Sequence, residues 1–206
     1  TDISEFSQPR TMVLWSSFMT GENKESEVLQ DGNKEMWDKK WEIGKTFFSN
    51  FKDPIVIDLP GFSYDLDAHE RSRELLKNFF MTEDAEKKEE IRKEYNKDAF
   101  DHHKKIKDKF FEALKGNHDL VLGYFSVVDV IGHLNFGNKT MMKMLYKEME
   151  EIYDAIPKDA KILVLSDHGM KALGMFGDHS EYGFWSTNFK DLGNPKITDI
   201  KEELIS

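Results

Sequence analysis

Two apolar stretches of this chain end in an aspartate and a histidine beside a glycine, and this repeated pattern constrains the fold more than any other feature. The apolar run in residues 161–170 (KILVLSDHGM) stops abruptly and places Asp167 and His168 just past its end. A buried parallel strand that delivers side chains to an active site ends in this way. The two side chains offer a carboxylate oxygen and an imidazole nitrogen, a combination suited to zinc and similar divalent metals. The stretch therefore predicts a buried strand with candidate metal ligands at its carboxyl end.

Two further segments repeat the association of histidine with aspartate. Residues 119–133 (DLVLGYFSVVDVIGH) contain an apolar run followed by Asp129 and His133, which are four residues apart. One helical turn would place these two side chains on the same face. Further on, His179 follows an aspartate in the sequence GDHSEYGFWS. Two adjacent metal ions need about six to eight ligands, and five candidates are Asp129, His133, Asp167, His168 and His179.

The charge of the chain argues against one class of function, the general binding of nucleic-acid polymers. Among the 206 residues 33% are charged and the formal net charge is −10, so the protein as a whole repels phosphate polymers. A small anionic substrate would need local positive charge, which bound divalent metals provide. We therefore expect no nucleic-acid polymer as a partner.

The absence of cysteine excludes disulfides and a thiolate nucleophile, and it is compatible with a cytoplasmic location. No apolar run is long enough to span a bilayer and no signal peptide opens the chain, so we expect no membrane partner. The chain starts at Thr1 within a polar segment. We expect that an amino-terminal part of the gene product, with any signal it carries, is missing.

In the first part of the chain, residues 11–20 (TMVLWSSFMT) predict a short helix, or a strand-to-helix turn, that ends at Gly21. Residues 22–35 are polar and typical of a loop. A helix is expected over about residues 33–43, with Met36, Trp37 and Trp41 facing inward. Residues 54–59 (PIVIDL) predict a buried strand that Pro60 and Gly61 terminate.

The remainder of the chain predicts alternating helices and strands. Residues 68–115 are charged and predict two helices that divide near Met81. Of the two neighbouring histidines in the second helix, His102 and His103, we expect one to be exposed and the other to lie at the edge of the core. A strand over 119–128, a helix over 138–155 and a strand over 161–165 then predict a right-handed parallel crossover. The fold class is therefore α/β, with residues 1–206 as one domain and residues 68–115 as a helical insertion or cover.

These motifs together resemble the type I phosphodiesterase and nucleotide pyrophosphatase branch of the alkaline phosphatase superfamily. The resemblance rests on D-x-x-G-H after one strand, S-D-H-G-M after the next, and PRTMVLWSSFMTG at residues 9–21. Thr11 precedes Gly21 by ten residues, the spacing of the nucleophile segment in that family. Val13 stands where the family has a proline, and the family's P-x-x-H-G is absent.

The resemblance implies a mostly parallel sheet flanked by helices and a two-metal hydrolase of phosphate esters that passes through a phosphothreonine on Thr11. It implies that Asp129, His133 and His179 hold one metal, while Asp167 and His168 hold the other beside Thr11. The metals would be zinc, with manganese or iron as alternatives. The substrate would be a small phosphate ester or nucleotide. The family has one more ligand, an aspartate on a first strand, and no residue of this chain matches it.

Other functions stay open at this point. A phosphomonoesterase of the same superfamily would share the motifs, and a non-catalytic binding or structural domain with a degenerate metal site would explain the unmatched aspartate. A metal-independent hydrolase has less support because the chain has no G-x-S-x-G elbow. Three aromatic side chains could stack on a leaving group, although core positions are more common for them: Trp15, Phe184 and Trp185.

Overall fold

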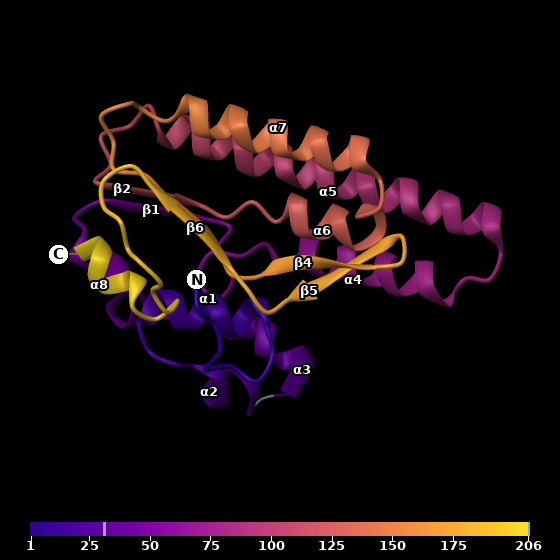
Figure 1. The fold of residues 1–206 in the computed structure, drawn as a ribbon, viewed down its shortest axis with the longest axis horizontal. Helices are drawn as coiled ribbons and strands as arrows, with labels where there is room; N and C mark the ends of the chain where they lie inside the picture. Colours follow the sequence, from indigo (N-terminus) through magenta and orange to yellow (C-terminus); the bar gives the residue numbers. More distant parts are fainter. Residues whose placement is uncertain (31, 206) are drawn as a thin grey trace.

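Helices cover both faces of a layer of short strands, so the fold combines helices and strands in an α/β arrangement (Figure 1). The computed structural model describes residues 1–30 and 32–205. The long helices α5 (Ala85–Ala113) and α7 (Lys139–Ala155) lie above the strands, and α1 (Thr11–Thr20) lies below them. The other helices are α2 (Glu25–Leu29), α3 (Gly32–Glu35), α4 (Leu66–Met81), α6 (Val127–Asn135) and α8 (Ile200–Ile205), with 3₁₀ turns at Met36–Asp38, Ile43–Lys45 and Phe47–Asn50.

The strands form three separate pairs. Strand β1 (Pro54–Ile57) is parallel to β2 (Leu120–Gly123), whereas β3 (Leu163–Ser166) is antiparallel to β6 (Phe184–Thr187). The third pair is a hairpin of β4 (Gly169–Leu173) and β5 (Phe176–Ser180). Within the described residues no ladder joins β2 to β3. The predicted parallel crossover and the mostly parallel sheet are therefore not confirmed.

The expected strand over residues 119–128 is too long, because only its first part is extended. Strand β2 ends at Gly123 and helix α6 begins at Val127. The buried apolar residues of this helix, Val127, Ile131 and Leu134, follow a spacing of four and three, which matches a helical turn. The same helix carries Asp129 and His133, so the prediction that one helical turn separates them is confirmed.

Helix α1 lies at the centre of the largest apolar cluster. Every residue from Met12 to Thr20 is buried, and the strand residues that pack on this cluster are Val56, Leu120, Leu122, Leu163 and Leu165. The buried hydroxyls find partners: Ser17 donates to the Val13 carbonyl, and Ser16 accepts from the Trp41 indole. The helix ends at Gly21, which has a left-handed φ of 71°, as predicted.

The predicted helix over residues 33–43 is wrong. The described backbone there has the short α3, a 3₁₀ turn at Met36–Asp38 and an irregular segment that includes Trp41. Helix α2 also occupies part of the predicted loop over residues 22–35. The inward position predicted for Met36, Trp37 and Trp41 is nevertheless confirmed, since Met36 is 7% exposed and both tryptophans pack against the core.

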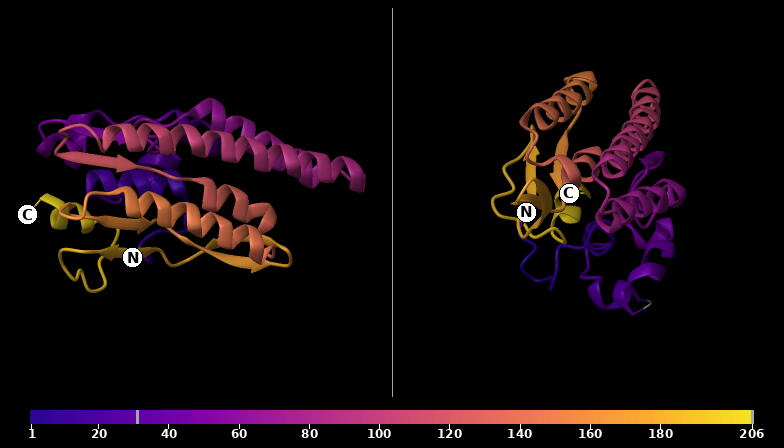
Figure 2. Two further views of the ribbon diagram at one scale, coloured as in Figure 1. Left: turned by 90° about the horizontal axis from the view of Figure 1, so that it is seen from above. Right: turned by 90° about the vertical axis from the view of Figure 1, so that its right-hand side faces the viewer.

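Helices α4 and α5 form the expected pair, which extends beyond the strands (Figures 1 and 2). Asp65 and Asp84 begin these helices, each accepting a hydrogen bond from a backbone N–H in the first turn. The expectation that one of the two histidines is exposed is wrong. His103 is 5% exposed, and His102 lies 2.7 Å from the buried carboxylate of Asp58.

None of the helices within the described residues is both long enough and apolar enough to cross a membrane.

Candidate functional site

The six residues singled out from the sequence lie on four different parts of the fold, and the structure brings them together. Thr11 is the first residue of α1, and its Oγ1 lies 3.5 Å from Nε2 of His168. The His168 ring stacks on the His179 ring with centroids 3.7 Å apart. His179 Nε2 in turn lies 3.4 Å from Oδ1 of Asp129. These contacts form a continuous path from the threonine hydroxyl to the carboxylate on α6.

Backbone carbonyls orient the histidines on each side of Asp129. Nδ1 of His133 lies 3.2 Å from the carbonyl oxygen of Gly177, and Nδ1 of His179 lies 3.1 Å from that of Pro9. A histidine whose Nδ1–H is bonded to a carbonyl presents Nε2 as its free ligand atom. Both Nε2 atoms face the same oxygen, Oδ1 of Asp129, at 3.6 and 3.4 Å. This is how histidines are held at metal sites.

The turn between β3 and β4 supplies Asp167 and His168. Both are only 6% exposed, and Nε2 of His168 lies 3.7 Å from Oδ2 of Asp167. Nδ1 of His168 lies 3.0 Å from the carbonyl oxygen of Gly169, so this histidine also has its Nε2 directed into the site. The chain thus places three imidazole Nε2 atoms and two carboxylates in one region.

The pKa values of these groups reflect burial opposed by mutual attraction. Burial alone would raise the pKa of Asp129, but the adjacent His133 and His179 side chains outweigh it and hold this pKa well below its usual value. Burial alone would lower the pKa of His179, but Asp129 raises it to about 9. Asp167 has a raised pKa, first because it is buried and also because Asp129 lies near. Positively charged neighbours therefore stabilise the Asp129 carboxylate.

A divalent cation fits this cluster. Within this cluster three buried atoms have no hydrogen-bond partner: Oδ1 of Asp129, Oδ2 of Asp167 and Nε2 of His179. Unpaired buried polar atoms are costly, and coordination to a metal would satisfy all three. One ligand atom each from Asp129, His168 and His179 can be chosen so that all lie within 4.8 Å of one another. His168, which the family resemblance assigns to the second metal, is thus also close to ligands of the first.

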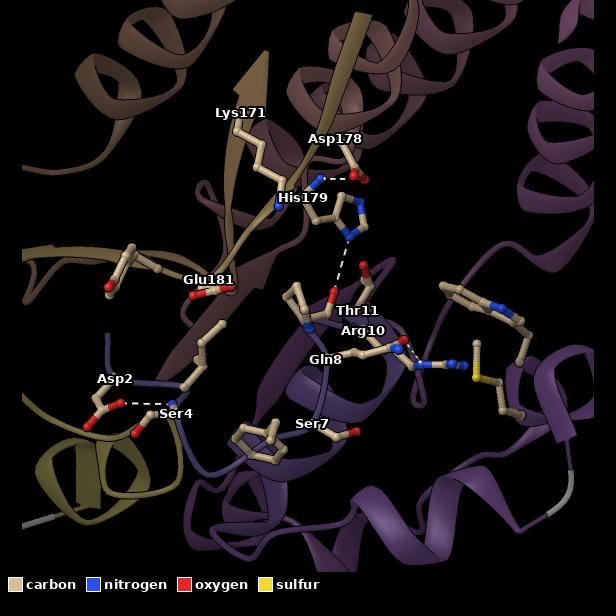
Figure 3. A pocket seen from close by; sticks show the side chains of 16 residues that line it. Asp2, Ser4, Ser7, Gln8, Arg10, Thr11, Lys171, Asp178, His179 and Glu181 are labelled. Carbon is tan, nitrogen blue, oxygen red and sulfur yellow. Dashed lines mark hydrogen bonds between the residues drawn. The ribbon is translucent and has the colours of Figure 1, made fainter. Parts of the chain in front are cut away.

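Thr11 lies where a phosphate group could bind. It begins a helix whose first turn has no acidic residue and whose cap residue, Arg10, makes no side-chain capping hydrogen bond. The free N–H groups and the partial positive charge of such a helix end attract anions. A cavity of about 750 Å³ opens beside it and is lined by Thr11 and His179 (Figure 3). A substrate in this cavity would therefore lie beside both Thr11 and His179.

Sequence reasoning missed several residues of the cavity wall. Arg10, Trp37 and Lys171 line it, whereas Trp15, Phe184 and Trp185 do not belong to its lining. The position of Arg10 directly before Thr11 was a usable signal in the sequence. No sequence signal placed Trp37 at the cavity: the sequence predicted only that it faces inward, and it does pack against the core.

One comparison with known proteins identifies a family. The model of the family described as "Type I phosphodiesterase / nucleotide pyrophosphatase" matches residues 17–187. This range covers most of the chain and contains the five candidate ligands, but it begins after Thr11. Searches of curated proteins and of solved structures found no match.

Proposed function

The chain belongs to the type I phosphodiesterase / nucleotide pyrophosphatase family, and on this premise we propose that it hydrolyses small phosphate diesters or nucleotides with Thr11 as nucleophile. The family membership supports a hydrolase of phosphate esters. One observation carries the assignment to this site: the Thr11 hydroxyl at the start of α1 lies 3.5 Å from His168, within the histidine and aspartate cluster. We also propose the finer features that the family implies, a single alkaline-phosphatase-like domain with residues 68–115 as an insertion, in the cytoplasm.

Two divalent metal ions are part of the proposal. Asp129, His133 and His179 would hold one ion, and Asp167 and His168 the other, with zinc as first choice and manganese or iron as alternatives. When bound, the ions supply positive charge that stabilises the developing charge on the phosphate and lowers the pKa of a nearby hydroxyl. The carbonyl groups of Gly177, Pro9 and Gly169 keep the three histidines directed inward.

Residues of the chain itself would bind the phosphate and carry out the two displacement steps. The N–H groups at the start of α1 bind phosphate oxygens, which places the phosphorus beside the Thr11 hydroxyl. The Thr11 oxygen attacks the phosphorus and releases its proton to solvent. The bond to the leaving oxygen breaks, and that oxygen keeps the electron pair and takes up a proton. Water then attacks the phosphothreonine, the bond to Thr11 breaks, and the threonine recovers its proton.

A matched pair of variants tests the nucleophile. With Zn²⁺ present and bis(p-nitrophenyl) phosphate as substrate, we expect Thr11→Ala to lower kcat by about 10³-fold or more, because the attacking oxygen is gone. Thr11→Ser keeps a hydroxyl and should retain measurable turnover. Both variants should bind as much zinc as the parent. Hydrolysis by Thr11→Ala at the parent rate would show that another group attacks.

The unmatched family aspartate keeps a second function open, a non-catalytic domain with a degenerate metal site. Metal analysis of the purified protein separates the two: about two tightly bound divalent ions per chain support the hydrolase, whereas fewer than one supports the non-catalytic domain. A phosphomonoesterase would instead show a higher kcat/KM for p-nitrophenyl phosphate than for the diester.

A further inference from the structure

Helix α6, which carries Asp129 and His133, lies between the long helix α5 and the hairpin of β4 and β5 (Figure 1). The hairpin side of α6 already has a role, because the carbonyl group of Gly177 orients His133. The side that faces α5 has none so far. Helix α5 belongs to residues 68–115, for which the sequence predicts only an insertion or a cover. Its contacts with α6 therefore decide whether it contributes to the site.

Tyr95 of α5 bonds to the middle of α6. Its side chain is 2% exposed, and its hydroxyl donates to the carbonyl oxygen of Val130 at 2.8 Å. Val130 follows Asp129 and precedes His133, so the bond joins the helix between its two candidate ligands. Burial raises the pKa of Tyr95 despite an opposing contact with Ser72, and the charge of Asp129 adds to the rise. The hydroxyl therefore keeps its proton and acts as the donor.

A second polar contact ties the carboxyl-terminal end of α6 to the same turn of α5. The Asn135 amide donates to Oδ1 of Asn96 at 2.9 Å and to the Ile131 carbonyl at 3.0 Å. Asn135 is 5% exposed, so its amide would be costly to leave without partners. Leu134 of α6 also packs in one apolar cluster with Tyr95. Hydrogen bonds at two points along α6 restrict both its sliding along its axis and its rotation about it.

Small movements of α6 matter because both candidate ligands move with it. Asp129 and His133 lie one turn apart on this helix, and a metal site tolerates deviations of only about 0.2 Å in its ligand distances. Apolar packing alone is not directional, whereas a hydrogen bond to a backbone carbonyl is. Loss of a group that orients a ligand from outside typically weakens metal binding by about 10- to 100-fold.

We propose that Tyr95 is a positioning residue of the metal site, and that α5 holds the ligand helix α6 in place through the Tyr95 hydroxyl and through Asn96. The helical cover is then a part of the site. The inference rests on the proposed function, since it takes Asp129 and His133 to be metal ligands. It does not depend on turnover, because Tyr95 acts through the position of the ligands.

Binding of Zn²⁺ to the full chain tests this role. Tyr95→Phe removes only the hydroxyl and keeps the buried ring. We expect this variant to bind Zn²⁺ about 10-fold more weakly than the parent in competition with a chelating indicator. With Co²⁺ in place of Zn²⁺, its visible absorption spectrum should differ from that of the parent, because the bands depend on the arrangement of the ligands. Asn96→Ala should also weaken Zn²⁺ binding.

A matched control on the same helix separates positioning from a general loss of stability. Ile106 is 3% exposed, and its apolar cluster, which includes Ile57 and Phe110, has no member from α6 among the described residues. Ile106→Val and Tyr95→Phe should both lower the urea midpoint of the metal-free protein. Only Tyr95→Phe should change the Zn²⁺ affinity and the Co²⁺ spectrum. Should Tyr95→Phe fail to fold, Asn96→Ala at its partly exposed position carries the test with the same outcomes.

The outcomes separate this inference from the proposed function. Parent-like Zn²⁺ affinity and Co²⁺ spectrum in Tyr95→Phe, or an equal loss of affinity in Ile106→Val, would overturn the positioning role alone. A parent protein that binds no Zn²⁺ would overturn both proposals. Hydrolysis of bis(p-nitrophenyl) phosphate reports only on the proposed function. A protein whose Zn²⁺ binding depends on Tyr95 but which leaves the diester intact refutes the hydrolase and supports the positioning role.

Discussion

Gly177 lies where strand β5 packs against helix α6, and its replacement by alanine tests whether that contact holds the histidine cluster together. A Cβ atom at Gly177 would lie 2.8 Å from the carbonyl oxygen of Gly132, and it would also collide with the Met170 sulfur. The Met170 side chain can rotate away, but the backbone carbonyl cannot. Ordinary contact begins at 3.4 Å, so β5 must move away from α6 by about 0.6 Å.

This displacement should weaken both the fold and the site. We expect Gly177→Ala to lower the free energy of unfolding by about 1–3 kcal/mol, the usual cost of overpacking. Because β5 carries His179 and α6 carries Asp129, the 3.4 Å separation of their side chains would also change. The Gly177 carbonyl that orients His133 would move as well. Zn²⁺ affinity should therefore fall by about 10- to 100-fold.

The assay combines urea unfolding of the metal-free protein with a Zn²⁺ titration. In Gly132→Ala the added Cβ would meet only the end of the Met170 side chain, so Met170→Ala should rescue Gly132→Ala but not Gly177→Ala. Gly44→Ala meets nothing within 4 Å and serves as a neutral control. A Gly177→Ala protein that unfolds and binds zinc like the parent would refute the idea that this backbone contact positions the ligands.

Two further predictions concern histidines outside the cluster, the partly buried His69 and the buried His103. Burial first, and Arg73 second, lower the pKa of His69 to about 4, so the unfolded chain takes up a proton more readily than the folded chain once the pH falls below about 6.5. The stability that neutral His69 contributes above that pH should thus be lost toward pH 4. Urea titrations should show that between pH 6.5 and 4.5 the free energy of unfolding of the parent falls by about 1–2 kcal/mol more than that of His69→Gln. An equal decrease in the two proteins would contradict this prediction. His103 is 5% exposed and neither of its ring nitrogens has a hydrogen-bond partner. His103→Leu should therefore raise the free energy of unfolding at pH 7 by about 1 kcal/mol, and a decrease would show that the attraction to Glu148 at 3.7 Å dominates.

Several of the sequence predictions held because they depend on local spacing. The helix over residues 11–20 with its glycine end, the split of the charged helices near Met81, and the helix that follows Asn138 are all present. The side chain of Asn138 accepts a hydrogen bond from the Met141 N–H and so caps the last of these helices. Helices repeat the same short-range contacts along the chain, so their pattern is visible in the sequence.

The wrong predictions arose where a local sequence pattern was compatible with two different structures. The apolar run from Leu120 to Val128 satisfies a strand at its start and a helix at its end, and the bend after Gly123 divides it. The sequence predicted that one of His102 and His103 is exposed, but a carboxylate from the distant loop after β1 lies 2.7 Å from Nε2 of His102 and His103 is buried. Asp58, which supplies that carboxylate, has a left-handed φ of 59°, and no pattern in the sequence predicts this conformation.

By itself the sequence determined the four longest helices (α1, α4, α5 and α7), the chemical nature of the candidate ligands and the placement of Asp129 and His133 one helical turn apart. Only the tertiary structure decided that β3 pairs with β6 in antiparallel fashion, and that Arg10 and Trp37 share a cavity with Thr11. A four-residue strand has no preference of its own for one partner. Backbone hydrogen bonds and packing between segments far apart in the chain decide which strand pairs with β3. They also decide which side chains lie next to Asp167 and His168 at its end.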